Sequence, residues 1–526
     1  MSEAGIIVFI CKFAGGREGS LDIPVLKVYA SKLPGVHRAE IIDQACKPQG
    51  MEQIAQALRS SGSDRFVVAA CSPLVREKRI GRVARESGLN PYMVSFANLR
   101  EQCAFVHGPN EADSKAKRLL RMAVAHCASL RPAPFGEREI KSQTVLVLGD
   151  GVRAALILNE LSRLPFDVRC MAPDGRLKLP LLVDAHIVAA LDFGSGEGAV
   201  TAGTLVKLEG APGSFTATIA QDGATQQIAC GAVIVTFDPV GSPPMEGRVG
   251  TLELARALAG QRRIPRQVVL VVGDWRSPQP TGMQMEAALN AAIELKNRSP
   301  LSEVAVVAQE VMTPGSLEAK QLLAQKLGVL FFRSDEAPQT RPFGATNLVF
   351  RDQVLGEVAI AADMVVDFSY APNERSSRTC EALHIGARPD GLPLESRVRL
   401  RPAASIRDGI FVVDPWNEGC SADMLADCRA AVARAEELLH APNIEFGGSV
   451  ASVTKEKCSA CLECVRICPY GAPLIADAGK AIISEELCQG CGMCVSLCPS
   501  KAIDMHVFSD SAMIVQGDAA LKGADE

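Results

Sequence analysis

Eight cysteines near the C-terminus form two runs with the same internal spacing. In each run, two residues separate each of the first three cysteines from the next, and a fourth cysteine follows after three intervening residues, immediately before a proline. Thiolates at this spacing bind [4Fe–4S] clusters, so the tandem runs predict two clusters and one-electron chemistry. The residues are Cys458, Cys461, Cys464 and Cys468, then Cys488, Cys491, Cys494 and Cys498.

The fourth cysteine of each run is expected to bind the cluster of the other run, as in bacterial ferredoxins. Pro469 and Pro499 keep each run from closing around its own cubane. Small residues between the ligands, such as Ala460 and Gly490, allow backbone amides to approach the sulfurs and tune the reduction potential. The expected ligand sets are Cys458, Cys461, Cys464 and Cys498 for the first cluster, and Cys488, Cys491, Cys494 and Cys468 for the second.

Zinc sites and disulfides are the alternative uses of such cysteines. Zinc sites usually present two separated pairs of cysteines rather than runs of four. Disulfides need an oxidising compartment, whereas the N-terminal segment, with an acidic residue followed by a short apolar strand, does not read as a signal peptide. The 18 cysteines therefore indicate a reducing cytoplasm and metal binding.

Composition limits the classes of partner. The net charge of −5 and an aromatic content of 5% argue against a nucleic-acid partner. The sequence has no apolar stretch of about 18 residues, so we expect no membrane span. With 526 residues, the chain is too long for one core, and three or four domains are expected.

The expected fold class is α/β, followed by a ferredoxin-like α+β domain. Residues 1–130 alternate apolar strands with helical patterns, which predicts a small parallel α/β domain. Residues 142–440 repeat this theme at larger scale as a Rossmann-like domain, and residues 450–508 form the domain for two [4Fe–4S] clusters. Linkers are expected between these domains, and the polar tail after Ser509 is expected to be loose.

Four further cysteines lie at or just beyond the predicted strands of the N-terminal domain. The ligand crevice of a parallel sheet lies outside the carboxyl ends of its strands, so these cysteines are expected to meet at one edge. His37, Asp43, Arg100 and Glu101 are expected to orient the same edge. Because free cysteine is often buried, four structural core cysteines are the alternative. The four residues are Cys11, Cys46, Cys71 and Cys103.

Residues 5–127 resemble the N-terminal domain of the A-type subunits of heterodisulfide reductase. The resemblance implies a third, non-standard [4Fe–4S] cluster on the four N-terminal cysteines. It continues weakly through the middle of the chain and strongly in the C-terminal cysteine runs. The matching stretches are Leu33–Val36, Val67–Pro73, Gly88–Tyr92, Asn98–Cys103 and Arg121–Ala125.

The family's middle domain resembles thioredoxin reductase and carries FAD. Gly149, Gly151 and Ala154 preserve its phosphate-binding turn as G-x-G-x-x-A between a predicted strand and helix. However, Asp150 brings a carboxylate to the phosphate position, and Ala172 stands where an acidic ribose-binding residue is expected. FAD binding and a Rossmann-like scaffold that has lost its flavin both remain open.

The resemblance implies an electron-transfer subunit of a cytoplasmic multi-subunit oxidoreductase that uses [4Fe–4S] clusters and, if retained, FAD. Its implied partners are disulfide-reducing subunits or hydrogenase-linked small subunits. The alternative is a flavin-free iron–sulfur scaffold that connects partner subunits without catalysis of its own. A free-standing NAD(P)H flavoenzyme is disfavoured, because the second turn, Gly273-Asp274-Trp275, lacks a glycine fingerprint.

Overall fold

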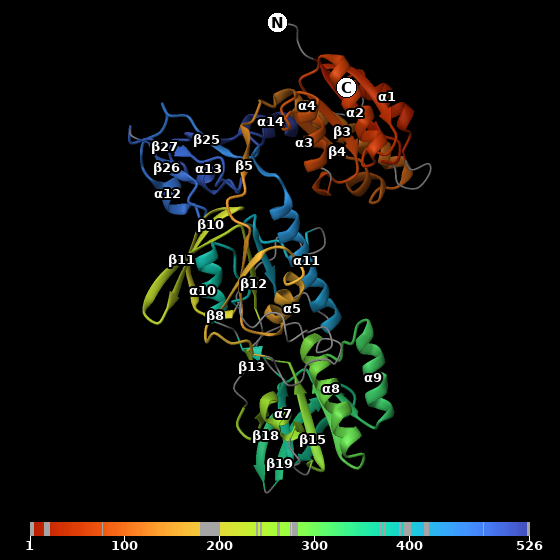
Figure 1. Cartoon of the computed structure of the whole chain (residues 1–526). Helices are drawn as coiled ribbons and strands as arrows, with labels where there is room; N and C mark the ends of the chain where they lie inside the picture. Colours follow the sequence, from red (N-terminus) through yellow and green to blue (C-terminus); the bar gives the residue numbers. More distant parts are fainter. Residues whose placement is uncertain are drawn as a thin grey trace. The chain divides into compact units, whose positions relative to one another are not determined.

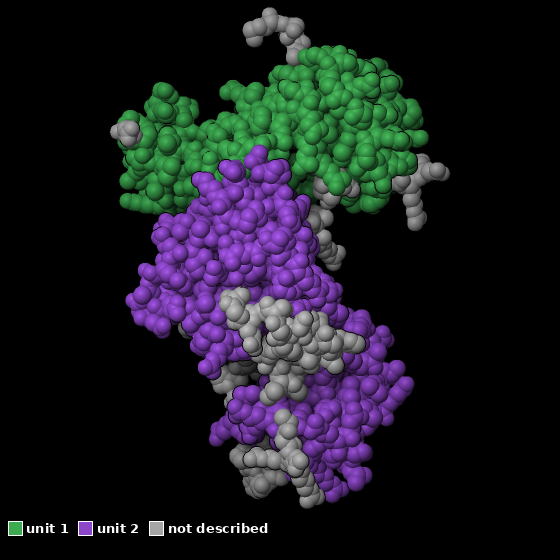
Figure 2. Space-filling view, viewed as in Figure 1, with its two compact units in different colours: residues 1–138, 445–526 green, residues 139–444 purple. Residues whose placement is uncertain are grey.

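The chain divides into two compact units (Figure 2). Each unit has its own sheets and apolar cores. One unit combines residues 1–138 with residues 445–526, and the other contains residues 139–444. The computed structural model describes residues 5–14, 21–75, 77–178, 200–237, 240–241, 245–259, 264–273, 275, 282–343, 345–368, 370–371, 374–388, 391–393, 401–414, 420–476 and 478–522.

A parallel sheet with strand order β2-β1-β3-β4 forms the centre of the N-terminal part. Ile10 on β1 lies opposite Ile41 on β2 and Ala69 on β3, so the carboxyl ends of these strands reach the same edge. Every residue of β1 and β3 is buried, which is typical of a parallel sheet covered on both faces. The strands are β1 (Ile6–Cys11), β2 (Val36–Ile42), β3 (Phe66–Ala70) and β4 (Val94–Asn98).

Helices pack against this sheet through one continuous apolar core. Gly62, which directly follows α2, adopts a left-handed conformation and ends this helix. The N-terminal helices are α1 (Ile23–Ala30), α2 (Pro48–Ser61), η1 (Pro73–Val75), α3 (Glu77–Glu86), the π-helical turn η2 (Arg100–Ala104) and α4 (Pro109–Ser129).

The C-terminal tail is a helix rather than a loose segment. Ser509 caps α14 (Asp510–Leu521) by accepting a hydrogen bond from the amide of Ala512 at 3.3 Å. The helix packs along α4 in the same unit (Figure 1). The expectation of a loose tail was therefore wrong, because tertiary packing stabilises a helix whose sequence has no clear amphipathic pattern.

The cysteine runs lie in a small module built from two similar halves (Figure 1). In each half, one short helix carries the third cysteine of a run. Two antiparallel pairs, β25 with β28 and β26 with β27, frame the module. The elements are β25 (Ala451–Val453), α12 (Glu463–Ile467), β26 (Pro473–Ile475), β27 (Ala481–Ile483), α13 (Met493–Leu497) and β28 (Ile503–Met505).

The chain passes from one unit to the other through two short strands that pair with each other, β5 (Phe135–Glu139) and β24 (Asn443–Gly447). Gly447 has a φ of 109°, and a side chain there would overlap the carbonyl oxygen of Pro134. The expected linkers are thus ordered by strand pairing. The first and last of the three domains expected from the sequence lie in the same compact unit.

The second unit begins with a parallel sheet of strand order β23-β12-β6-β7-β8. Helices α5 and α11 share a core with it, and an antiparallel sheet of order β11-β10-β9 packs against its other face. The elements are β6 (Thr144–Leu148), α5 (Val152–Leu161), β7 (Asp167–Ala172), β8 (Val200–Ala202), β9 (Thr204–Ala211), β10 (Ser214–Gln221), β11 (Ala224–Cys230), β12 (Ala232–Thr236), β23 (Ile410–Val413) and α11 (Ser421–His440).

A second parallel sheet, of order β14-β21-β15-β16-β17, completes this unit together with an antiparallel sheet of order β18-β19-β20. These sheets confirm the expected fold class. The elements are β13 (Val240–Gly241), β14 (Val249–Gly250), α7 (Thr251–Ala259), β15 (Gln267–Val272), α8 (Gly282–Arg298), β16 (Glu303–Ala308), α9 (Ser316–Lys326), β17 (Leu330–Arg333), β18 (Gln339–Phe343), β19 (Ala345–Asp352), β20 (Gly356–Ala362), β21 (Met364–Phe368), β22 (Tyr370–Ala371) and α10 (Glu374–Leu383).

Candidate iron–sulfur sites

Three cysteines of the first run and one of the second border an open space of about 360 Å³, which we call the first cavity. Three of its cysteines come from the loop before α12 and the first turns of that helix, and the fourth follows α13. Apolar side chains such as Ala481 and Ile503 complete the lining. The cysteines that line it are Cys458, Cys461, Cys464 and Cys498.

Three cysteines of the second run and one of the first border a similar space of about 330 Å³, the second cavity. Its lining includes Ala451 and Ile483. The structure thus brings the fourth cysteine of each run to the cavity of the other run, which is the grouping expected from the sequence. The cysteines that line this cavity are Cys488, Cys491, Cys494 and Cys468.

Left-handed backbone conformations shape both cysteine loops. In the first loop Ala460 and Leu462 have φ values of 56° and 64°, and in the second Gly490 and Gly492 have 66° and 74°. Backbone that alternates between right- and left-handed conformations can bring successive N–H groups to one side of a loop, where they form an anion-binding nest. The first loop achieves this with two residues other than glycine, at a cost of about 1–2 kcal/mol each.

The cysteine thiols differ in their surroundings. Burial raises the pKa of Cys494 to about 11, and the neighbouring thiols of Cys488, Cys491 and Cys468 contribute to this rise. Hydrogen bonds from the backbone of Ala481 and Ala460 lower the pKa of Cys458. Thiols must lose their protons to bind iron, so metal binding by these residues would release protons.

Hydrogen bonds also reach Cys498. Its sulfur accepts a bond from the amide of Ala502 at 3.3 Å and lies 3.6 Å from Oγ of Ser500. Burial raises the pKa of Cys498, but these hydrogen bonds outweigh burial and lower it overall. Among the described residues, no three His, Cys, Asp or Glu side chains are arranged to hold a single metal ion. A cubane places no such demand, because each thiolate binds a separate iron.

The four N-terminal cysteines lie at or beyond the carboxyl ends of four neighbouring strands. Cys11 ends β1 opposite Ile42, and Cys71 directly follows β3. Cys46 lies in the turn before α2, and Cys103 lies in the π-helical turn after β4. The π-helical geometry is often found at functional sites. The structure therefore brings all four cysteines to one edge of the sheet.

Hydrogen bonds hold the loops of this edge together. The amide of Ser72 donates to Oε2 of Glu101 at 2.7 Å, and the amide of Asp43 donates to Oε1 of Gln53 at 3.2 Å. The Cys103 thiol is fully buried and donates to the carbonyl oxygen of Ala112 at 3.1 Å. Burial raises the pKa of Cys103, so this thiol would have to give up its hydrogen bond to become a ligand.

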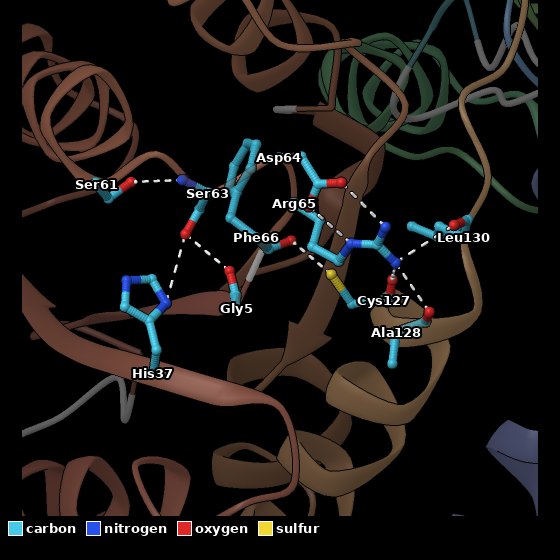
Figure 3. A network of polar contacts seen from close by, with 10 residues as sticks. All are labelled: Gly5, His37, Ser61, Ser63, Asp64, Arg65, Phe66, Cys127, Ala128 and Leu130. Atoms are coloured by element: carbon cyan, nitrogen blue, oxygen red, sulfur yellow. Dashed lines mark hydrogen bonds and ion pairs between the residues drawn. The ribbon is translucent and has the colours of Figure 1, made fainter. Parts of the chain in front are cut away.

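His37 does not belong to this edge. It lies near the start of β2, and its Nδ1 atom is 3.4 Å from Oγ of Ser63, which in turn donates to the carbonyl oxygen of Gly5 (Figure 3). The expectation that His37 orients the cysteine edge was wrong, because the strand register places it at the opposite end of the sheet.

The same end of the sheet holds a structural cap for α4. Arg65 forms a two-point ion pair with Asp64 and donates through Nη1 to the carbonyl oxygens of Ala128, at 2.9 Å, and Leu130, at 3.5 Å (Figure 3). A cation at a helix C-terminus satisfies carbonyl groups that lack partners within the helix. Cys127 beside it is buried, and burial raises its pKa to about 12, as expected for a core cysteine rather than a ligand.

The dinucleotide turn lies between β6 and α5, as predicted. Gly149 packs closely on Thr236 at the end of β12, so a side chain there would overlap the threonine hydroxyl. The Asp150 carboxylate binds Lys178 at 3.2 Å and Arg375 at 3.3 Å. Lys178 also binds Asp174 at 2.6 Å, so the acidic residue nearest to the ribose position is paired within the chain.

Sequence reasoning missed a buried cation beside this turn. Arg153, in the first turn of α5, is only 1% exposed. Burial raises the pKa of Asp427 on α11 to about 6, and the nearby carboxylates of Asp423 and Asp414 add to this while Arg153 opposes it. The available signal was a single arginine in the apolar first half of α5, VRAALIL. Ala154 follows Arg153 and is also buried.

Comparisons with known proteins agree with the cysteine pattern. Residues 457–503 match the family described as 4Fe-4S dicluster domain. The A-type subunit of the H(2):CoB-CoM heterodisulfide,ferredoxin reductase of Methanothermobacter thermautotrophicus is 25% identical over 99% of this chain and 98% of that protein. The chain resembles the A-type subunits of heterodisulfide reductases along nearly its whole length. In Methanopyrus kandleri, the second A-type iron-sulfur subunit of CoB--CoM heterodisulfide reductase is 24% identical over 91% of this chain and 92% of that protein.

The first A-type iron-sulfur subunit of the same organism is 37% identical over 160 residues, which make up 30% of this chain and 24% of that protein. Among solved structures, thioredoxin reductase of Lactococcus lactis aligns with 56% of this chain and 99% of its own, with a TM-score of 0.40 and 13% identity. None of the described helices reaches the length and apolar character needed to cross a bilayer.

Proposed function

We propose that this protein is an electron-transfer subunit that holds two [4Fe–4S] clusters in its C-terminal module. The observation that carries the proposal is the division of eight cysteines into two groups of four, each around its own cavity. The donor set fits the group, since four thiolates per site are what a cubane requires. The clusters would supply one-electron chemistry, and the chain would set their separation, solvent exposure and hydrogen bonding.

The N-terminal edge is a candidate site for a third cluster. Cys11, Cys46, Cys71 and Cys103 approach it from four adjacent loops, and the resemblance to the heterodisulfide reductase family covers these loops. Such a site differs from the C-terminal ones, because its ligands come from separate strands rather than from one run. We propose this ligand set together with the three domains at 1–130, 142–440 and 450–508.

The residues at the dinucleotide turn do not fit FAD. The Asp150 carboxylate at the N-terminus of α5 already binds Lys178 and Arg375, so these cations are engaged rather than available to a pyrophosphate, and Asp174 is already paired with Lys178. We therefore propose a flavin-free middle domain that acts as a scaffold, and no flavin step is assigned to Gly149, Gly151 or Ala154. This is the second candidate function, in which the clusters carry electrons and the middle domain serves assembly.

The partners are proposed to be other subunits of a redox complex. The similar proteins are named as subunits of heterodisulfide reductases, which supports an assembly with disulfide-reducing or hydrogenase-linked small subunits. A reducing compartment such as the cytoplasm would keep the ligand thiols available for iron.

The test is the iron, sulfide and flavin content of the anaerobically purified full chain. We expect about eight irons per chain from the C-terminal module, or about twelve if the N-terminal site is filled. Cys498→Ser should lower the iron content and alter the EPR spectrum after dithionite, whereas Cys428→Ser, at a buried cysteine of α11, should change neither. Protein with no clusters would refute the proposal, and a stoichiometric flavin would refute the flavin-free middle domain.

A further inference from the structure

The two cavities are related by a sequence offset that allows a position-by-position comparison. Cys488 follows Cys458 by 30 residues, and the same offset relates the other ligands. It also relates the linings, since Ala451 of the second cavity corresponds to Ala481 of the first, and Ile483 corresponds to Val453. Differences between equivalent positions therefore show how the chain treats one site differently from the other.

The first difference is a cation. Lys480 donates a hydrogen bond from Nζ to the carbonyl oxygen of Cys458, so its ammonium group lies against the first ligand loop. The equivalent position in the other half is Val450, a buried apolar residue. A positive charge close to a cluster favours its reduced form, because reduction adds one negative charge.

The second difference concerns hydrogen-bond donors to the fourth cysteine of each run, Cys498 at the first cavity and Cys468 at the second. Cys498 at the first cavity accepts from the amide of Ala502 and lies near Oγ of Ser500, and Ile503, which also lines this cavity, has an amide N–H. The equivalent of Ile503 is Pro473, which has no N–H group to donate to Cys468. Donors to cluster sulfurs raise the reduction potential.

The charged residues in and beside the two runs differ as well, and they make the surroundings of the first run more positive than those of the second. Lys455 corresponds to Glu485, and Arg466 corresponds to Ser496. One pair opposes the trend, since Glu463 corresponds to Met493. The Glu463 carboxylate is, however, paired with Arg466 at 3.3 Å, which offsets its charge near the first cavity.

We propose that the site formed by Cys458, Cys461, Cys464 and Cys498 has the higher reduction potential of the two. This inference rests on the proposed function, because both cavities must hold clusters. A single electron in the module would then reside mainly on the first site. Lys480 and the donors around Cys498 act as tuning residues, since they adjust the potential without binding iron.

The experiment is an anaerobic potentiometric titration of the full chain, followed by EPR. We expect the C-terminal module to contribute two resolved one-electron waves, besides any wave from the N-terminal site, with at least about a tenfold preference for one C-terminal site, which corresponds to about 59 mV. Lys480→Met should lower the higher wave and leave the lower one in place. Lys326→Met, which removes an exposed charge from α9, should move neither wave.

Pro473→Ile provides a second, independent variant, because it restores an amide N–H near Cys468 and should raise the lower wave. The inference is overturned if the waves coincide in the unmodified protein, or if Lys480→Met shifts the lower wave. Absence of two cluster signals would instead overturn the proposed function. The two failures are thus distinguishable in a single titration.

Discussion

Arg121 on α4 donates from Nε to the carbonyl oxygen of Ala519 at 2.7 Å, across 398 residues of sequence. The same guanidinium donates to the carbonyl oxygen of Lys522 and contacts the Tyr29 hydroxyl at 3.3 Å. It is 8% exposed and caps the C-terminus of α14. The last helix of the chain is therefore held by the N-terminal domain.

Replacing Arg121 with methionine should release α14. The change removes hydrogen bonds from a buried charged donor to helix carbonyls, which we expect to cost about 2–3 kcal/mol. Hydrogen exchange of α14 amides should accelerate, and limited proteolysis should cut near the C-terminus. Arg118→Met, at an exposed position of the same helix, serves as the control and should leave both readouts unchanged.

Gly490→Ala should disrupt the second cysteine loop. A side chain at Gly490 would overlap the carbonyl oxygen of Ser449, in addition to the strain of a left-handed φ. We expect the free energy of unfolding to fall by about 3 kcal/mol or more and the visible absorbance of the second cluster to weaken. Gly492→Ala is the matched control, because it has a similar φ but nothing within 4 Å of the added atom. Its expected cost is about 1 kcal/mol. Equal effects of the two changes would contradict this argument.

Glu286→Ala should destabilise the second unit. The Glu286 carboxylate, nearly fully buried, binds Lys320 at 2.7 Å and accepts bonds from the amide and hydroxyl of Ser421 at 2.7 and 2.8 Å. Its loss removes the acceptor for these groups, so the free energy of unfolding measured by chemical denaturation should fall by about 3 kcal/mol. Glu294→Ala removes an exposed pair with Arg298 on the same helix and should cost about 0.5 kcal/mol or less. A Glu286 effect no larger than this control would argue against a buried network.

Asp427→Asn should stabilise the protein in a pH-dependent way. Burial raises the pKa of Asp427 from 3.8 to about 6, so the folded state favours the protonated acid. The stability that the protonated Asp427 side chain allows the folded state is fully present below about pH 4 and is lost as the pH rises through 6. Asparagine stays neutral and should therefore add about 1 kcal/mol at pH 7.5, after screening by solvent is allowed for, and nothing near pH 4.

Thermal unfolding at the two pH values checks this expectation. Glu437→Gln, an exposed acid on the same helix, is the control and should shift the melting temperature at neither pH. A stabilisation by Asp427→Asn that is equal at both pH values would show that the ionisation of Asp427 is not its cause.

Features that depend on a local pattern of residues could be predicted before folding was considered. Apolar runs predicted buried strands alternating with helices in residues 1–130, where the parallel sheet of β1 to β4 lies, because buried parallel strands need uninterrupted apolar side chains. The spacing of the two cysteine runs identified the candidate iron–sulfur ligands, since a cubane constrains the loop that wraps it. The strand-end placement of the N-terminal cysteines followed from the topology of a parallel sheet.

Features that join distant segments of the chain depend on how it folds and have no local signature. The sequence analysis did not anticipate α14, because its stability comes from α4 and from Arg121 rather than from its own pattern. The pairing of Asp150 with Arg375 spans 225 residues, and no local periodicity encodes such a contact. For the same reason, the sequence left FAD binding open, whereas the ion pairs around Asp150 and Asp174 provide a physical argument against it.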